Sequence, residues 1–162
     1  MVQHWFATGV VALVLASAPP PAQLGVVIVT PGPSPEITLG TAAGTQILSG
    51  ELARELAHIA GASVEVVGRQ AGDRIFVQTY RIVEVQGARR PYVGILRREQ
   101  DGFVLVDGSA RGIDLSVEPA MQMALADRVG ARIWLAGDKL LSGQIKVRRY
   151  GLLRPAGARQ GP

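Results

Sequence analysis

The chain has 162 residues, of which 48% are hydrophobic and 19% are charged, with 17 Lys and Arg against 13 Asp and Glu. This length and apolar fraction fit one medium domain or two small ones and exclude an intrinsically disordered chain. Because the chain has no Cys, disulfide-stapled folds, thiolate catalysis and Cys-based metal sites are also excluded.

The first 22 residues carry no Asp, Glu, Lys or Arg, and they are apolar almost throughout from Phe6 to Ala18. This run is shorter than the ~20 apolar residues that a spanning helix needs and is typical of the apolar core of a signal peptide. We therefore expect residues 1–22 to be a signal peptide and the protein to be exported, either periplasmic or secreted. An uncleaved N-terminal anchor is the alternative, and we expect no other transmembrane segment.

Residues 23–36 contain a short apolar run at 26–29 between Pro-rich stretches. They are predicted to be a flexible linker that contributes at most an edge strand, because Pro cannot donate to a β-ladder. Apolar alternation begins at Ile37, and residues 37–86 have room for two short strands before the helix that follows Ser49, which is a suitable N-cap. We expect a first, abbreviated β-unit here.

An internal repeat links this unit to the second half of the chain. Residues 56–68 align with residues 125–137, and residues 75–83 align with residues 145–153. Both copies predict a helix ending in Gly-Ala, a strand ending in Gly, and a strand that carries Val-x-x-Tyr. The apolar alternation slips by one residue inside this last motif, which predicts a β-bulge in each copy and equivalent positions for Tyr80 and Tyr150.

Residues 91–155 predict a complete unit of three strands, a helix and two strands, which is the order of the OB-fold, a small Greek-key barrel. Asp101-Gly102 supplies a hairpin signal between the first two strands. The expected elements are strands at Tyr92–Glu99, 103–107 and Gly112–Ser116, a helix near 118–129, and strands near 131–137 and 143–153.

Strand alternation predicts which side chains of the second unit are buried. Ile133 and Leu135 are expected in the core, with Arg132 and Arg148 mostly exposed. Trp134 alternates out of phase with its neighbours, so it is expected to face either the other half of the molecule or a partner.

The runs 94–96 and 101–108, followed by 130–137 and 145–147, resemble the exported OB-fold proteins of bacteria, mainly over residues 91–155. The resemblance implies a mainly β protein with two short helices, built from duplicated OB-like barrels of which the first is abbreviated. Residues 156–162 are expected to be a disordered tail.

The sequence offers little for catalysis. One of the two His residues, His4, lies in the expected signal peptide, and His58 is expected on the solvent side of the first helix. No Gly-x-Ser-x-Gly elbow accompanies it, and Asp101 and Asp107 are best explained by turns. We expect no enzymatic activity, no cofactor and no metal site, and a carboxylate-based hydrolase is the least favoured function.

Positive charge is concentrated in the second half of the chain. Residues 1–86 carry 4 basic and 6 acidic side chains, whereas residues 87–162 carry 13 and 7. The first hairpin and the last strand of a barrel can be neighbours, so one basic patch with aromatic stacking platforms is the candidate binding site. Arginines that simply face solvent are the alternative interpretation. The candidate site residues are Arg97, Arg98, Arg148, Arg149, Tyr92, Phe103 and Tyr150.

Two functions remain. The first is an exported, non-catalytic OB-like binding module for a protein, a glycan or a small ligand. The alternative is a basic OB-type binder of polyanions, such as nucleic acid or an anionic surface polymer, outside the cytoplasm.

The short apolar run ending in small residues predicts a mature protein that begins between Ser17 and Gln23. N-terminal sequencing of exported material tests this expectation. Recovery of the membrane-bound protein with Met1 intact would favour the uncleaved anchor instead.

Overall fold

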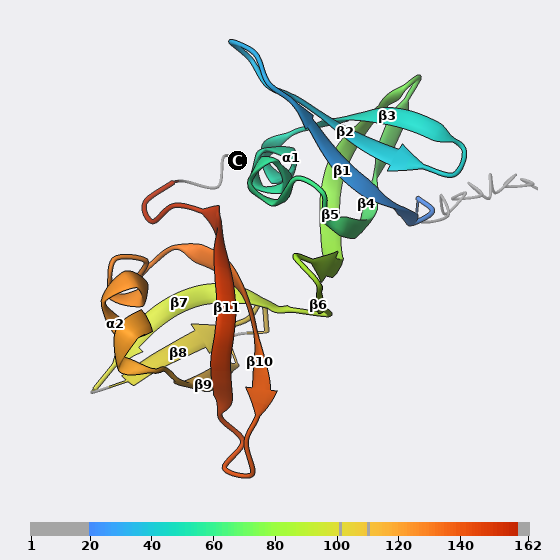
Figure 1. Cartoon of the computed structure of the whole chain (residues 1–162). Helices are drawn as coiled ribbons and strands as arrows, with labels where there is room; N and C mark the ends of the chain where they lie inside the picture. Colours follow the sequence, from blue (N-terminus) through green and yellow to red (C-terminus); the bar gives the residue numbers. More distant parts are fainter. Residues whose placement is uncertain (1–19, 101, 110, 159–162) are drawn as a thin grey trace, which may run out of the picture.

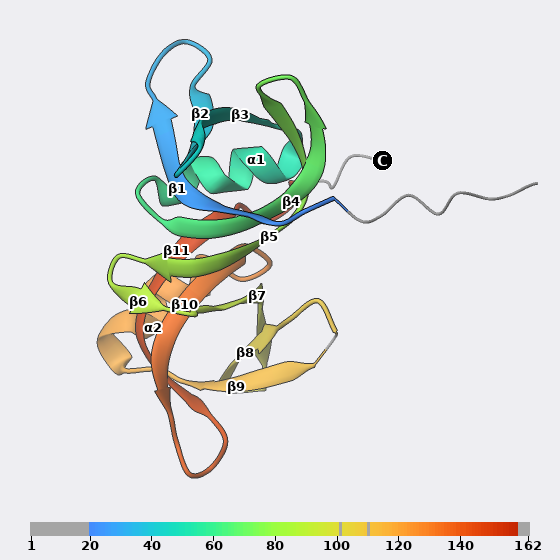
Figure 2. The same cartoon turned by 90° about the vertical axis from the view of Figure 1, so that its right-hand side faces the viewer.

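The computed structural model describes residues 20–100, 102–109 and 111–158. These residues form two closed five-stranded β-barrels, each with one short helix (Figure 1). Both barrels follow the order of three strands, a helix and two strands, which confirms the predicted mainly β fold of duplicated OB-like units. Figure 2 shows the first barrel stacked on the second.

Both barrels close through parallel pairing of their third and fifth strands, and in both the first strand also pairs antiparallel with the fourth. The elements of the first barrel are β1 (Gln23–Thr30), β2 (Glu36–Thr41), β3 (Gly44–Ser49), α1 (Glu51–Leu56), the 3-10 helix η1 (Ala57–Ile59), β4 (Ser63–Ala71) and β5 (Arg74–Val85). A short strand, β6 (Ala88–Arg89), pairs with β5 and leads to the second barrel. The elements of the second barrel are β7 (Tyr92–Glu99), β8 (Gly102–Val106), β9 (Gly112–Ser116), α2 (Pro119–Ala126), β10 (Arg132–Lys139) and β11 (Ile145–Arg154).

The first barrel is complete, which corrects the expectation of an abbreviated unit behind a flexible linker at 23–36. Strand β1 occupies most of that segment and pairs antiparallel with both β2 and β4. The Pro residues of the segment lie in the loop between β1 and β2, where their missing N–H groups interrupt no ladder. Val27 of β1 is 1% exposed and belongs to the core, so this strand is integral to the barrel.

Equivalent strands pair in the same register in the two barrels. In both, the ladder of the last two strands shifts beside a Gly within the fourth strand, Gly68 of β4 or Gly137 of β10. This shift leaves Gln78 of β5 and Arg148 of β11 without a ladder partner. These are the two predicted bulges. The matched ladder pairs are Val64–Ile82 and Val66–Tyr80 in the first barrel, and Ile133–Leu152 and Leu135–Tyr150 in the second. Tyr80 and Tyr150 therefore occupy equivalent positions, and both predictions from the repeat are confirmed.

Glycines occupy equivalent positions in the two barrels, where the backbone conformation or the close approach of strands requires them. A Cβ added to Gly25 or to Gly94 would lie 2.6 or 2.5 Å from a carbonyl oxygen of the neighbouring strand, so only Gly allows these strands to approach. Gly61 and Gly130 follow the helices with φ values of 81° and 84°, a left-handed conformation that favours Gly. Both backbones thus turn and close at the same places.

The helices differ from expectation at their ends. Ser49 does not cap α1. The N-cap is Gly50, and the Ser49 hydroxyl donates instead to the Ile75 carbonyl at 3.2 Å. Helix α2 begins at Pro119, as the tolerance of Pro in the first turn predicts, but it ends at Ala126 rather than near 129.

Several expectations concern residues that the structure does not describe. Residues 1–19 of the expected signal peptide and residues 159–162 of the expected tail lie outside the described residues, as does Asp101 of the predicted hairpin turn. The remaining tail residues, 156–158, form an exposed turn after β11.

Leu135 provides a direct test of the second core, because it is fully buried as predicted. We expect Leu135→Ala to lower the free energy of unfolding by about 2–5 kcal/mol through lost burial and a residual cavity. Leu141→Ala is the matched control, since Leu141 is fully exposed in the loop between β10 and β11, and its change should stay within about 0.5 kcal/mol. Denaturant titration of both variants compares them, and equal losses would contradict the assigned core.

Candidate functional site

The structure does not gather the predicted basic and aromatic residues into one patch. Arg97 and Arg98 lie on β7, whereas Arg148 and Arg149 lie on β11, and β10 separates the two strands in the barrel. The first hairpin and the last strand are therefore not neighbours here, which removes the topological basis of the predicted patch.

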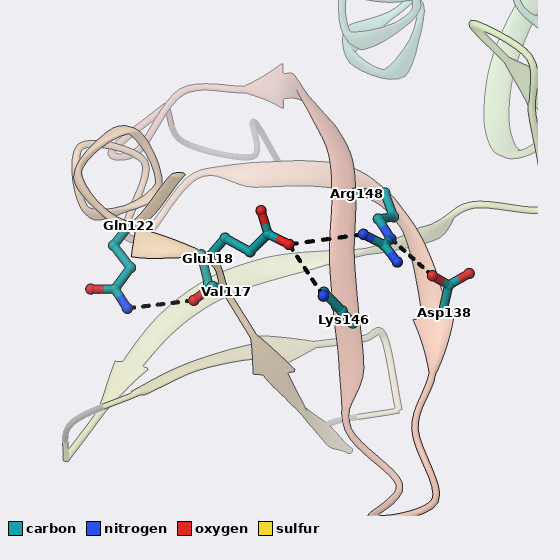
Figure 3. Close-up of polar contacts among 6 residues, drawn as sticks. All are labelled: Val117, Glu118, Gln122, Asp138, Lys146 and Arg148. Atoms are coloured by element: carbon teal, nitrogen blue, oxygen red, sulfur yellow. Dashed lines mark hydrogen bonds and ion pairs between the residues drawn. The ribbon is translucent and has the colours of Figure 1, made fainter. Parts of the chain in front are cut away.

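Arg148 is exposed, as predicted, but its charge is balanced by acidic neighbours. Its guanidinium donates to the Asp138 carboxylate at 2.9 Å and lies 3.8 Å from a Glu118 oxygen (Figure 3). The same Glu118 oxygen lies 3.2 Å from Nζ of Lys146. This network joins β10, β11 and the start of α2, so we assign it to the solvated surface of the barrel.

Arg149 and Tyr150 of β11 and Tyr92 of β7 have structural partners as well. Nη1 of Arg149 donates to the Gln86 carbonyl at 2.6 Å, which ties β11 to the connection between the barrels. Tyr150 and Tyr92 are half-buried and pack against the core of the second barrel. The core of the second barrel therefore covers part of both side chains.

Two of the predicted site residues, Arg98 and Phe103, do come together. The guanidinium of Arg98 lies over the Phe103 ring, 5.8 Å from its centroid. Both side chains line a groove of about 280 Å³ between the β7–β8 hairpin and α2. Arg97, one residue earlier on the strand, does not line this groove and is exposed.

Sequence reasoning missed a buried ion cluster between the barrels. Glu55 of α1 is 3% exposed, and its carboxylate oxygens lie 3.1 Å from Arg132 and 3.3 Å from Arg154, which belong to the second barrel. The Tyr80 hydroxyl donates to the same carboxylate at 2.6 Å. The side chain of Arg132 is 25% exposed, so the prediction that it is mostly exposed was wrong.

The electrostatics of this cluster keep the tyrosine neutral. Burial, and then the hydrogen bond to Glu55, raise the pKa of Tyr80 far above its ordinary value. The guanidinium of Arg132 also lies over the Tyr80 ring, 5.6 Å from its centroid. Tyr80 is therefore a permanent hydrogen-bond donor, and two cations share a single carboxylate.

An apolar contact surrounds the ion cluster. Trp134 and Leu153 of the second barrel are 1% and 0% exposed and belong to the core cluster of the first barrel, against which Val93 and Ala136 also pack. The sequence predicted that Trp134 faces the other half of the molecule or a partner, and the first of these is confirmed.

A row of exposed apolar side chains lies on the outer face of β1. Leu24, Val26 and Ile28, which we call the β1 row, are 61%, 44% and 45% exposed. Sequence reasoning missed the row because it lies in the segment taken as a linker. The alternation of these three residues with buried Gly25 and Val27 was the signal that could have revealed it.

The described residues also bear on metal binding, catalysis and membrane insertion. Within them, no group of three or more His, Asp or Glu side chains could hold a metal ion. His58 is exposed, as predicted. The Asp107 carboxylate accepts hydrogen bonds from the hydroxyl and backbone N–H of Ser109, as expected for a turn, and these bonds lower its pKa. None of the helices in this part of the chain is long and apolar enough to cross a membrane.

No protein-family model matches the chain, and no curated protein shows significant sequence similarity to it. The function must therefore be argued from the residues that the two barrels present.

Because Glu55 is buried between two arginines, a conservative substitution at this residue should lower the free energy of unfolding substantially. Glu55→Gln keeps the shape of the side chain but leaves Arg132 and Arg154 partly buried without an anion. We expect a loss of about 2–4 kcal/mol in the free energy of unfolding, below the full cost of breaking a buried pair because both guanidinium groups keep some contact with water.

Glu65→Gln is the matched control, because Glu65 pairs with Arg81 on the exposed face of β4 and β5. Its loss should stay below about 1 kcal/mol. Thermal and denaturant melts of both variants measure the difference, and a Glu55 variant as stable as the control would show that the cluster contributes nothing to the barrel contact.

Proposed function

We propose that this protein is an exported, non-catalytic binding module whose β1 row contacts a partner protein. The first barrel presents this row, and the Glu55 ion cluster and the apolar contacts of Trp134 and Leu153 join it to the second barrel. One observation supports the proposal most directly. Val93, the residue of the second barrel that is equivalent to Leu24 of the β1 row, packs against the first barrel.

The shared register defines the correspondence. Leu24 pairs with Glu65 in the first barrel as Val93 pairs with Trp134 in the second, so Leu24 and Val93 are equivalent. Val93 packs against the first barrel, whereas Leu24 is 61% exposed. Exposed rows of large apolar side chains are characteristic of interaction surfaces. The β1 row is therefore an apolar surface at a place where the equivalent surface of the other barrel is covered by protein. We expect a partner protein to cover the β1 row in the same way.

Export is supported by the sequence before β1. The uncharged apolar run ends at Ala18, and β1 begins at Gln23. Cleavage between Ser17 and Gln23 would remove none of the strands, so the mature protein would keep both barrels.

Binding of polyanions is the second candidate, and one observation favours it. Among the described residues, Arg97 and Arg98 have no acidic partner within ion-pair distance, in contrast to Arg148. Because Arg148 and Arg149 are held by other contacts, only these two adjacent arginines of the predicted patch are available to an anion.

Site-specific photo-cross-linking in the producing cells tests the proposal. A photoreactive amino acid at Val26 should give a discrete adduct with a partner protein, and the additional change Leu24→Glu should remove this adduct. The same photoreactive residue at Val129 is the matched control, because Val129 is 38% exposed on the second barrel, and it should give no such adduct.

Equal labelling from both positions, or none from Val26, would contradict the proposal. Retention of the purified protein on heparin, with a steep salt dependence that disappears in the Arg97→Ala/Arg98→Ala variant, would favour the polyanion binder instead.

A further inference from the structure

The groove beneath Arg98 supports an inference beyond the proposed function, because it lies in the second barrel and not on the β1 row. Its lining includes Phe103, Val117 and Ala126, with Arg98 and Met123 also contributing. Met123 is 80% exposed, so its side chain is available to a ligand in the groove. The groove thus combines apolar side chains with a cation.

The first barrel has an equivalent groove. The strand register matches Ile37 with Phe103, and the repeat matches Ala57 with Ala126. Ile37 and Ala57 line a hollow of the first barrel, and one wall of that hollow is the segment Pro33–Ser34–Pro35 of the β1–β2 loop. A proline-containing stretch of the chain therefore lies beside this groove in the first barrel.

Among the described residues, the second barrel has no such wall. Five residues, 31–35, separate β1 from β2, whereas only 100–101 separate β7 from β8. A two-residue turn is too short to form a wall like the one that Pro33–Ser34–Pro35 forms near Ala57 in the first barrel. The same groove is consequently left open on the side that the Pro-rich loop lines in the first barrel.

We propose that the groove between α2 and the β7–β8 hairpin binds an extended, proline-containing segment of a partner protein that carries a carboxylate. The segment takes the place that Pro33–Ser34–Pro35 occupies beside the first groove. Its proline rings pack on the apolar lining, and its carboxylate pairs with Arg98.

Each feature of the groove suits this ligand. A proline has no N–H group to satisfy, and its restricted backbone loses little entropy on binding, so apolar and aromatic grooves suit Pro-rich segments. Met123 is flexible enough to adapt its side chain to the rings. The Arg98 guanidinium lies over Phe103 and has no acidic partner among the described residues, which leaves its donors available to a carboxylate.

Gln122 adds a polar contact on the helix side of the groove. Its Nε2 donates to the Val117 carbonyl at 3.4 Å, which orients the side chain (Figure 3). Its Oε1 can then accept an N–H from a residue between the prolines. The site thus recognises apolar rings, one backbone donor and one negative charge.

A peptide titration followed by NMR tests this proposal on the full chain. The probe is a synthetic peptide with the sequence of residues 30–36, blocked at both ends, which contains three prolines and one Glu. Saturable shifts are expected at the amides of Phe103, Gln122 and Ala126. Arg98→Ala should weaken binding about tenfold through loss of a charge-assisted hydrogen bond.

Arg97→Ala is the matched control, because it removes the same charge from the neighbouring position outside the groove, and it should change the dissociation constant by less than about twofold. A peptide with Ala in place of the three prolines should not bind. Leu24→Glu should leave peptide binding unchanged. This variant therefore distinguishes failure of the groove proposal from failure of the proposed function of the β1 row. Absence of saturable shifts, equal losses in the Arg97 and Arg98 variants, or equal binding of the Ala peptide would each overturn the proposal.

Discussion

The arrangement of the two barrels depends on a single carboxylate. Glu55 comes from the first barrel, and both of its cationic partners, Arg132 and Arg154, come from the second. A buried carboxylate costs several kcal/mol unless it is paired, so one barrel cannot slide or rotate on the other without losing this compensation. The apolar contacts of Trp134 and Leu153 supply the attraction between the barrels, and the ion cluster fixes their orientation.

Duplication preserved the backbone of each barrel and changed the side chains on its outside. Trp134 lies opposite Gly151 in the second barrel, where it packs on the first barrel, whereas the equivalent ladder pair of the first barrel is the exposed ion pair of Glu65 and Arg81. On the helices, Glu55 corresponds to Ala124. The two halves therefore fold alike but cannot exchange roles in the contact between them.

Local patterns in the sequence were sufficient for most of the fold. Alternation, turn residues and the slip before Tyr80 and Tyr150 depend on neighbours in the chain. They predicted the element order of the second barrel, both bulges and the burial of Ile133 and Leu135, but not the partial burial of Arg132. Strand β1 was missed because the Pro-rich composition of residues 23–36 is that of a loop. The prolines of this segment all lie after the strand, in the β1–β2 loop. The ion cluster was missed because no local pattern distinguishes Glu55 from an exposed helical glutamate.

In the candidate site, too, contacts between residues close in sequence could be predicted, whereas contacts between distant strands could not. Pairing of Arg98 with Phe103 needs only a hairpin, and the structure contains it, whereas convergence with Arg148 needed adjacent strands that the barrel separates by β10. Because equivalent glycines and bulges hold both backbones, replacements on the outer surface leave the barrels intact. The β1 row and the groove beside α2 are two exposed sites at which the barrels differ, and a distinct binding function could arise at either one without loss of the fold.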